Sequence, residues 1–176
     1  MQPKRSAAEG NPGTSFPAWA WVLAGAVLVL DQASKLLVQH LIRPLETVAV
    51  IPDFFRLVHV LNKGAAFGFL NRPDMQWQAY FFICVTLVAV GIIVYLLHSS
   101  ERRDRFFLLG LGAILGGALG NLVDRVRMGM VIDFLDFSIG SFHWPAFNVA
   151  DCAITVGALS LLASFYRRER HASGTH

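Results

Sequence analysis

Residues 106–125 read FFLLGLGAILGGALGNLVDR, an apolar run that ends in polar and charged residues. A helix that crosses a bilayer needs roughly 17–25 residues, and the uncharged part of this run, 106–123, reaches that length. Gly112, Gly116 and Gly120 recur at every fourth position and so fall on one helical face. Faces of this small-xxx-small kind let membrane helices pack closely. The run therefore predicts a transmembrane helix that packs tightly against a neighbour.

Three more apolar stretches have a similar length, at 19–37, 77–97 and 150–166. The composition also favours a membrane protein, because 55% of the 176 residues are hydrophobic and 15% are charged. An average soluble domain is roughly 25% charged. The first stretch follows a basic start, as in a signal peptide, but it lacks a small-residue cleavage pattern and is expected to be retained. We predict an all-α integral membrane protein with four transmembrane helices.

The rest of the chain is arranged around these helices. We predict a flexible cytoplasmic tail over 1–17, a transmembrane domain over 18–166 and a second cytoplasmic tail over 167–176. Lys and Arg cluster beside the helix ends that face the cytoplasm if both termini lie there, and the positive-inside rule favours this orientation. The net charge of +3 is modest, and the clustering suits membrane orientation better than nucleic-acid binding.

In this orientation two segments, 43–76 and 124–149, lie outside the membrane. The first contains β-prone runs at 47–51 and 54–60, separated by a Pro-Asp pair. Short runs of this kind between turn residues are typical of strands. We therefore predict a small extracytoplasmic β segment, either a sheet or a hairpin, within 43–76.

A set of aspartates lies in or beside the apolar runs. A carboxylate near the centre of a membrane helix costs on the order of 3 kcal/mol, so each one is a candidate for a functional site. The aspartates are Asp31, Asp124, Asp133, Asp136 and Asp151. Three of them, Asp31, Asp124 and Asp151, lie toward helix ends, and the predicted helix directions bring these three to one leaflet.

Two of these acids have nearby basic residues. Asp31 and Lys35 are four residues apart on one helical face, and an internal ion pair would lower the cost of both charges. Asp124 lies near a helix C-terminus, where the helix dipole disfavours an acid, so Arg125 or another cation is expected to compensate it. Asn121 shares the face of Asp124 and Arg125.

The remaining acids differ in their local setting. Asn148 can cap the last helix, and Asp151 then falls in its first turn, where the dipole favours an acid. Asp133 stands among apolar residues with no such local reason. Asp136 is expected in a solvent-exposed loop.

Two smaller features allow more than one interpretation. Asn62 and Gly64 favour an ordinary turn, but Asn62 and neighbouring backbone groups are also suited to bind an extended peptide. Cys84 and Cys152 lie within apolar runs without the spacing of a metal site, so we expect no metal and buried free thiols, with a disulfide between the two as the alternative.

Asp133 and Asp151 lie on separate elements that can meet at the lipid boundary. Two carboxylates in contact share a proton, so one can activate a water while the other protonates a carbonyl. This is the chemistry of an aspartic peptidase, which requires no cofactor. The alternatives are a proton- or ion-coupled transporter, whose intramembrane acids relay charge, and a membrane protein that binds lipid or peptide without catalysis.

Five motifs in order resemble bacterial lipoprotein signal peptidase (signal peptidase II), a family of aspartic peptidases. They are DQASK at 31–35, NKGAAF at 62–67, GGALGNLVDR at 116–125, VIDF at 131–134 and FNVAD at 147–151. Each motif alone is weak, but the ordered set is specific, and it covers residues 31–151.

The resemblance implies a multi-pass enzyme of the bacterial inner membrane, with both termini cytoplasmic and its active site toward the outer leaflet. It implies removal of signal peptides from prolipoproteins, on the N-terminal side of a diacylglyceryl-modified cysteine. It also implies contact with membrane lipid and inhibition by globomycin-type cyclic peptides. By motif, Asp133 and Asp151 would be catalytic. The supporting or substrate-binding residues would be Asp31, Lys35, Asn62, Gly64, Asn121, Asp124, Arg125 and Asn148.

Overall fold

The computed structural model describes residues 18–64, 77–99 and 104–173, and these contain four long helices and four strands. The predicted tail at 1–17 and the end of the NKGAAF motif lie outside the described residues. The helices are α1 (Ala18–Leu41), α2 (Trp77–Ser99), α3 (Arg105–Met128) and α4 (Val149–Ser173). All four are long and apolar enough to span a membrane, as predicted, and each extends beyond its predicted range.

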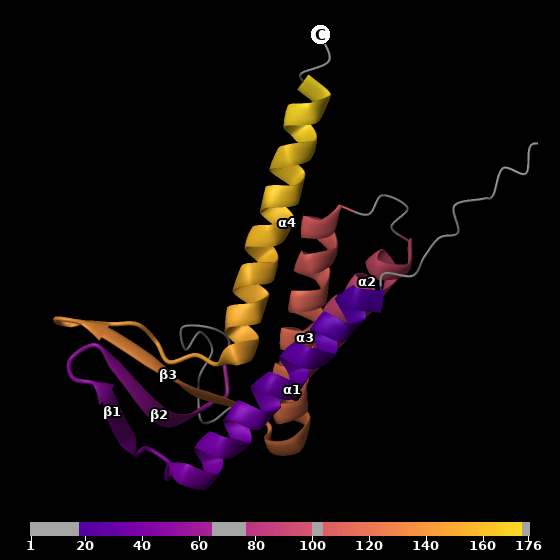
Figure 1. The fold of residues 1–176 in the computed structure, drawn as a ribbon. Helices are drawn as coiled ribbons and strands as arrows, with labels where there is room; N and C mark the ends of the chain where they lie inside the picture. Colours follow the sequence, from indigo (N-terminus) through magenta and orange to yellow (C-terminus); the bar gives the residue numbers. More distant parts are fainter. Residues whose placement is uncertain (1–17, 65–76, 100–103, 174–176) are drawn as a thin grey trace, which may run out of the picture.

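Helix α3 lies at the centre of the bundle (Figure 1). Within its apolar span 61% of the residues are buried, against 22%, 11% and 17% for α1, α2 and α4. A Cβ added to Gly112 would lie 2.6 Å from the carbonyl oxygen of Ala20, and one added to Gly116 would lie 2.5 Å from that of Ala24. The predicted small-residue face is therefore confirmed, and α1 packs against it.

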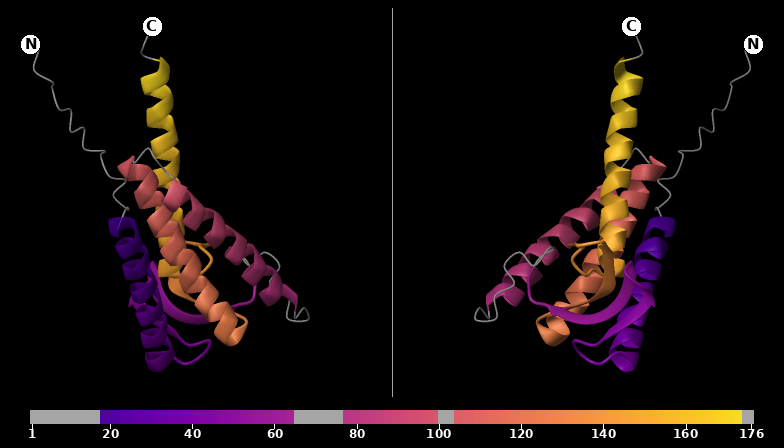
Figure 2. Two further views of the ribbon diagram at one scale, coloured as in Figure 1. Left: turned by 90° about the vertical axis from the view of Figure 1, so that its right-hand side faces the viewer. Right: turned by 90° about the vertical axis from the view of Figure 1, so that its left-hand side faces the viewer.

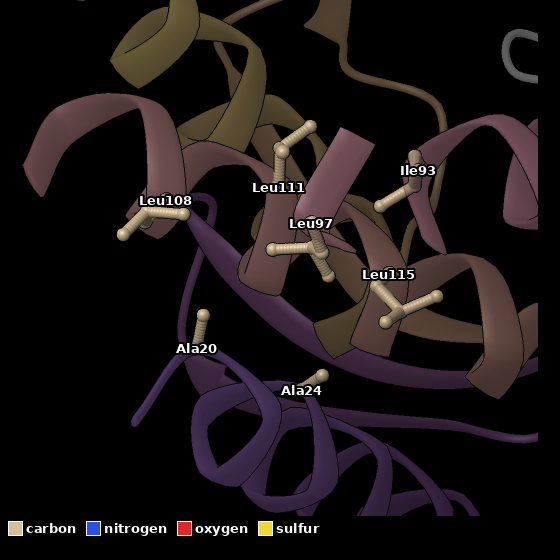
Figure 3. Close-up of a cluster of buried hydrophobic side chains, with 7 residues drawn as sticks. All are labelled: Ala20, Ala24, Ile93, Leu97, Leu108, Leu111 and Leu115. Carbon is tan, nitrogen blue, oxygen red and sulfur yellow. The ribbon is translucent and has the colours of Figure 1, made fainter. Parts of the chain in front are cut away.

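The apolar core occupies one part of the bundle (Figure 3). It joins α1, α2 and α3 through Ala20, Ala24, Ile93, Leu97, Leu108, Leu111 and Leu115. Toward the other end of α3 the buried side chains become polar. Helix α4 extends beyond the other helices at the core end (Figure 2).

A four-stranded antiparallel sheet stands at the end of the bundle where α1 ends and α4 begins (Figure 1). The sheet order is β1 (Thr47–Ile51), β2 (Phe55–Asn62), β3 (Val131–Ile139) and β4 (Phe142–His143). The predicted strands at 47–51 and 54–60 are confirmed as β1 and β2. The turn between them places Asp53 at φ 59, a left-handed conformation that Asp tolerates better than most residues.

Strands β3 and β4 were not predicted. Strand β3 is buried on both faces over most of its length, so it lacks the apolar–polar alternation of a half-exposed strand. It pairs with β2 from a distant part of the chain, and Asp133 lies opposite Val60. The sheet thus gives Asp133 a fixed position instead of a place in a loop.

Two expectations about exposure were wrong. Asp136 is only 7% exposed and lies on β3 opposite Arg56 of β2, with which it forms an ion pair. Strand pairing, which the sequence around Asp136 did not indicate, brings its counter-ion to it. Cys84 and Cys152 are free, as expected, but exposed, because α2 and α4 turn most of their surface outward.

Candidate active site

A buried lysine connects α1 to α3 at the sheet end of the bundle. Lys35 Nζ lies 2.8 Å from Asp31 Oδ2 and 2.8 Å from Asp124 Oδ2, and all three side chains are at most 1% exposed. The expected Asp31–Lys35 ion pair is confirmed. The cation that forms an ion pair with Asp124 is Lys35, on another helix. Lys35 also donates to Asn121 Oδ1 at 2.9 Å.

The two acids beside Lys35 also accept backbone N–H groups at the starts of α4 and β3. Asp31 Oδ1 accepts the Ala150 backbone N–H at 2.9 Å, in the first turn of α4. Asp124 Oδ2 accepts the Ile132 N–H at 3.4 Å, at the start of β3. Gln32 donates to Asp124 Oδ1 at 3.0 Å. The network therefore joins the elements that carry Asp133 and Asp151.

Asn148 caps α4, as predicted. Its Oδ1 accepts the backbone N–H of Asp151 at 3.0 Å, and Asp151 Oδ2 accepts the backbone N–H of Asn148 at 3.2 Å. This reciprocal pair resembles a capping box and satisfies N–H groups that the helix start leaves free. Asp151 Oδ1 also accepts from Asn121 Nδ2 at 2.9 Å.

Asp133 receives amide donors from two sides. Asn148 Nδ2 donates to its Oδ1 at 2.7 Å, and Asn62 Nδ2 donates to its Oδ2 at 3.0 Å. Burial, and then the charge of Asp151, raise the pKa of the Asp133 carboxyl to about 7. The two hydrogen bonds and the charge of Lys35 act in the opposite direction and are outweighed.

A turn and an arginine border the two acids. Asn62 Oδ1 accepts the Gly64 N–H at 2.8 Å, so Asn62 both forms the turn and reaches Asp133. Arg125 Nη2 donates to the Gly64 carbonyl at 3.2 Å, and the guanidinium lies 5.1 Å from the centre of the Phe82 ring. Asn62 therefore forms the predicted turn, and its side chain also lies beside Asp133 in the cavity.

These groups face one cavity of about 640 Å³. Its polar part is formed by Asn62, Asn121, Arg125, Asp133 and Asp151. Within the described ranges, no group of three or more His, Cys, Asp or Glu side chains is arranged to hold a metal ion. The cavity thus presents two carboxylates from different elements, held by amide donors, to whatever enters it.

Comparison with known proteins assigns this arrangement to a family. The family model described as signal peptidase (SPase) II matches residues 23–167. A lipoprotein signal peptidase of Maridesulfovibrio salexigens is 53% identical over 150 residues, which cover 85% of this chain and 96% of that protein. The chain belongs to the signal peptidase II family. It is thus a peptidase of the aspartic class, and its family gives no support to a transporter.

Other relatives agree with this assignment to signal peptidase II. A lipoprotein signal peptidase of Cupriavidus necator is 45% identical over 167 residues, which cover 94% of each chain. A solved bacterial membrane enzyme, studied by the in meso method, has a TM-score of 0.77 at 28% identity. The match covers 86% of this chain and 90% of that chain.

The structure brings together every site residue that the sequence motifs of signal peptidase II indicated. Asp31, Lys35 and Asp124 form the network behind the cavity, and the others line the cavity or bind the residues that do. Gln32 was missed, although an amide beside an acid in an apolar run is a recognisable signal. The aromatic residues of the cavity wall were also missed, because their grouping depends on the pairing of β3 and β4.

Proposed function

We propose that this chain removes signal peptides from prolipoproteins, on the N-terminal side of a diacylglyceryl-modified cysteine, with Asp133 and Asp151 as its catalytic pair. The observation that carries the proposal is the shared cavity, in which both carboxylates accept hydrogen bonds from side-chain amides. Membership of the signal peptidase II family supports the reaction, and residues 18–166 would form the peptidase domain.

The surroundings of the two acids support different roles for them. With a pKa of about 7, Asp133 holds a proton in about half of the molecules at neutral pH and in most of them at lower pH, so it can donate a proton. Asp151 lies in the first turn of α4, where the helix dipole favours negative charge, and accepts N–H donors on both oxygens. We assign Asp151 as the base and Asp133 as the acid.

The reaction then balances without any further group. Asp151 takes a proton from water as the water oxygen bonds to the scissile carbonyl carbon, and Asp133 gives its proton to the carbonyl oxygen. When the tetrahedral intermediate collapses, the C–N bond breaks and the proton on Asp151 passes to the leaving nitrogen. A hydroxyl proton of the intermediate returns to Asp133. The products are a signal peptide with a free carboxyl group and a lipidated cysteine with a free amine.

The substrate must be extended where it is cut, because a helix satisfies its own backbone groups and hides its amide bonds. Asn62, Gly64 and Arg125 border the acids and are suited to hold such an extended backbone. Asn121 and Asn148 would orient the carboxylates. A globomycin-type cyclic peptide would inhibit by occupying the same cavity.

We place the enzyme in the bacterial inner membrane, with both termini cytoplasmic and the cavity toward the outer leaflet. The end of the bundle opposite the cavity carries Arg105, Arg167, Arg168 and Arg170. The positive-inside rule expects such a cluster at a cytoplasmic end. Membrane lipid would surround the outward faces of the helices and deliver the substrate, which is itself lipid-anchored.

Cleavage of a diacylglyceryl-modified precursor by the purified enzyme in lipid nanodiscs tests the proposal. Asp133→Asn and Asp151→Asn each keep the shape of the side chain but remove the proton transfer, so activity is expected to fall at least about a thousandfold. Asp53→Asn is the matched control, because Asp53 lies in the β1–β2 turn away from the cavity. Either cavity variant retaining near-normal activity while properly folded would overturn the assignment.

A further inference from the structure

Two arginines near the end of α4 lie over aromatic rings at the start of α3. Arg167 Cζ lies 5.0 Å from the centre of the Phe106 ring, and Arg168 Cζ lies 5.4 Å from the centre of the Phe107 ring. Both arginines are exposed, and Phe106 is 40% exposed. We call these four residues the arginine–phenylalanine cluster. It lies at the end of the bundle opposite the cavity, and the proposed reaction does not use it.

The start of α3 marks a membrane boundary. The uncharged run of this helix, 106–123, extends about 27 Å at roughly 1.5 Å per residue. This length is close to the roughly 30 Å of the hydrocarbon core of a bilayer. The exposed Arg105 directly precedes the run. The rings of Phe106 and Phe107 therefore lie at the edge of the hydrocarbon core, next to the headgroup layer.

The two arginines of the cluster lie slightly beyond this boundary. A Cβ on Gly110 would lie 2.8 Å from the Gly157 carbonyl oxygen and 2.7 Å from Leu161 Cγ. Since α3 and α4 run antiparallel, Arg105 is level with about residue 164 of α4. The arginines follow roughly 5 Å farther along the α4 axis. This is the depth of lipid phosphates, because the headgroup layer is about 5–7 Å thick on each side of the core.

The ring contacts hold the guanidinium groups without using their hydrogen-bond donors. A guanidinium is attracted to the face of an aromatic ring through its charge, and it carries five N–H donors in a planar fork. Among the residues that the structure describes, no carboxylate forms an ion pair with Arg167 or Arg168. The fork of each arginine is thus available to a phosphate, which it can bind through two parallel hydrogen bonds.

The charge around the cluster stays positive when the nearby acids are counted. Asp104 Oδ1 accepts the Phe106 N–H at 3.2 Å and caps α3, and Glu169 is the other acid. Four arginines against these two acids leave a formal charge of +2. A surface of this sign at phosphate depth complements an anionic phospholipid. The arginines are Arg105, Arg167, Arg168 and Arg170.

We propose that the arginine–phenylalanine cluster binds the phosphate headgroup of an anionic phospholipid. The two guanidinium forks hold the phosphate, and the two rings beneath them fix the forks and border the hydrocarbon core. A zwitterionic lipid binds more weakly, because the cation beside its phosphate is repelled by the arginines. The proposal requires that the cluster lies at a membrane boundary but not that it faces a particular leaflet. It therefore stands or falls independently of the proposed cleavage reaction.

The test titrates phosphatidylglycerol into the full-length protein in a neutral detergent and measures the Kd of the first bound lipid by native mass spectrometry. Arg167→Gln and Arg168→Gln are each expected to raise this Kd about fivefold, the effect of one basic residue at an anionic lipid surface. Arg127→Gln is the matched control, because Arg127 is also exposed on α3 but lies at the opposite end of that helix. Its Kd should stay within about twofold of the parent value.

Two further variants separate a defined site from net charge. Arg170 lies over Tyr166 of its own helix, at 5.0 Å from the ring centre, so Arg170→Gln removes one charge without changing the cluster. Its Kd should rise less than about twofold. Phe106→Leu keeps all charges but removes the ring under Arg167, and should raise the Kd about two- to fivefold. Circular dichroism of each variant checks that the helices are intact.

Several outcomes would overturn the proposal. One is an equal Kd for phosphatidylglycerol and phosphatidylcholine. Another is a loss of binding in Arg127→Gln or Arg170→Gln as large as in Arg167→Gln, which would mean that net charge and not the cluster attracts lipid. Displacement of the lipid by millimolar inorganic phosphate would make the cluster a site for free phosphate. In nanodiscs, phosphatidylglycerol with a photoreactive headgroup should crosslink to 104–107 or 164–170, and crosslinks confined to other segments would refute the site.

Discussion

Asn148 contacts both carboxylates of the proposed catalytic pair. It is fully buried, donates to Asp133 Oδ1, and shares a reciprocal hydrogen-bonded cap with Asp151. Its Nδ2 also lies 3.2 Å from Asn121 Oδ1, the oxygen that accepts from Lys35. An amide cannot ionise, so this arrangement fixes the positions of two acids without adding a third charge. Asn148 and Asn121 are the links between the catalytic pair and the ion-paired network.

The raised pKa of Asp133 predicts how activity depends on pH. Asp133 must hold a proton to act as the acid, and its pKa is about 7. The rate constant kcat/KM is therefore expected to fall as pH rises through about 7. The pH dependence of kcat/KM reports pKa values of the free enzyme, here that of Asp133. Initial rates of precursor cleavage across this range would measure it. A flat profile up to about pH 9 would contradict the assignment of Asp133 as the acid.

Stability should follow the same titration. The folded-state pKa of Asp133 lies above the unfolded value of 3.8, so between these values the folded chain binds more protons than the unfolded one. The contribution of Asp133 to the free energy of unfolding is thus full below the unfolded pKa and is lost as pH rises through about 7. Asparagine does not titrate, so Asp133→Asn should not show this loss. As pH rises, the free energy of unfolding of the parent should therefore fall more than that of the variant. Thermal unfolding in nanodiscs measures the difference.

Lys35 is predicted to be the most costly charge to remove. It is the cation between Asp31 and Asp124, and all three side chains are almost fully buried. Removing one partner of a buried ion pair costs about 3–5 kcal/mol, because the remaining charge is left uncompensated. Lys35→Met should therefore lower the free energy of unfolding by that amount.

Arg56→Met is the matched control for Lys35→Met. Arg56 also pairs with an aspartate, but the Arg56 side chain is 32% exposed, and its removal leaves one unpaired acid, the largely buried Asp136, instead of two. The loss of Arg56 should therefore cost less than that of Lys35, about 1–3 kcal/mol. Equal losses of stability in the two variants would show that burial does not make the ion pairs of Lys35 more costly to break than that of Arg56.

At the scale of elements, close packing of α3 on α1 sets where the buried charges meet. A Cβ on Gly120 would overlap the carboxylate of Asp31, and one on Gly116 would lie 2.7 Å from Val27 Cβ as well as touching the Ala24 backbone. The helices approach as closely as glycine permits. This approach is what lets Lys35 on α1 reach Asp124 and Asn121 on α3.

Gly116→Ala is therefore expected to lower the free energy of unfolding by about 1–3 kcal/mol through overpacking against a backbone that cannot move aside. Gly25→Ala is the control, because a Cβ there has nothing within 4 Å. That change should be neutral or stabilise by up to about 1 kcal/mol through higher helix propensity. Chemical unfolding of both variants in the same detergent makes the comparison. A loss at Gly25 as large as at Gly116 would argue against close packing as the cause.

The elements also show what the sequence could and could not predict. The helices were predictable because membrane spans have a required length and apolar character, and β1 and β2 because turn residues separate them. Strand β3 was not, since its apolar faces both pack inside the protein. Asp31 and Lys35 were predictable as a pair on one helix. The partnership of Lys35 with Asp124, and of Arg56 with Asp136, depends on packing between distant segments.

On the scale of the whole molecule, the two ends of the bundle have different chemistry. The sheet and the cavity stand at one end, and aromatic and basic residues gather at the other. There the guanidinium of Arg167 lies 5.0 Å from the Phe106 ring centre, and that of Arg168 lies 5.4 Å from the Phe107 ring centre. These contacts join the start of α3 to the last turns of α4. Amphipathic groups of this kind suit a membrane–water boundary.

This polarity predicts the orientation of the chain. The basic end should face the cytoplasm, which puts the hairpin tip and the cavity on the opposite side. A chain with Cys84→Ala and Cys152→Ala offers a background without its native thiols, into which single cysteines can be placed. Ser141→Cys lies at the exposed β3–β4 turn, and Glu169→Cys lies on the exposed last turns of α4.

A membrane-impermeant maleimide added to cells with an intact inner membrane should label Ser141→Cys and leave Glu169→Cys unlabelled. Permeabilising that membrane should make both react, which controls for local accessibility. The reverse pattern would invert the orientation and place the cavity on the cytoplasmic side. Labelling of both in intact membranes would mean that the two ends do not lie on opposite sides. Since a diacylglyceryl anchor cannot readily cross the bilayer by itself, the side on which Ser141→Cys reacts is also the side on which the precursor must present its cleavage site.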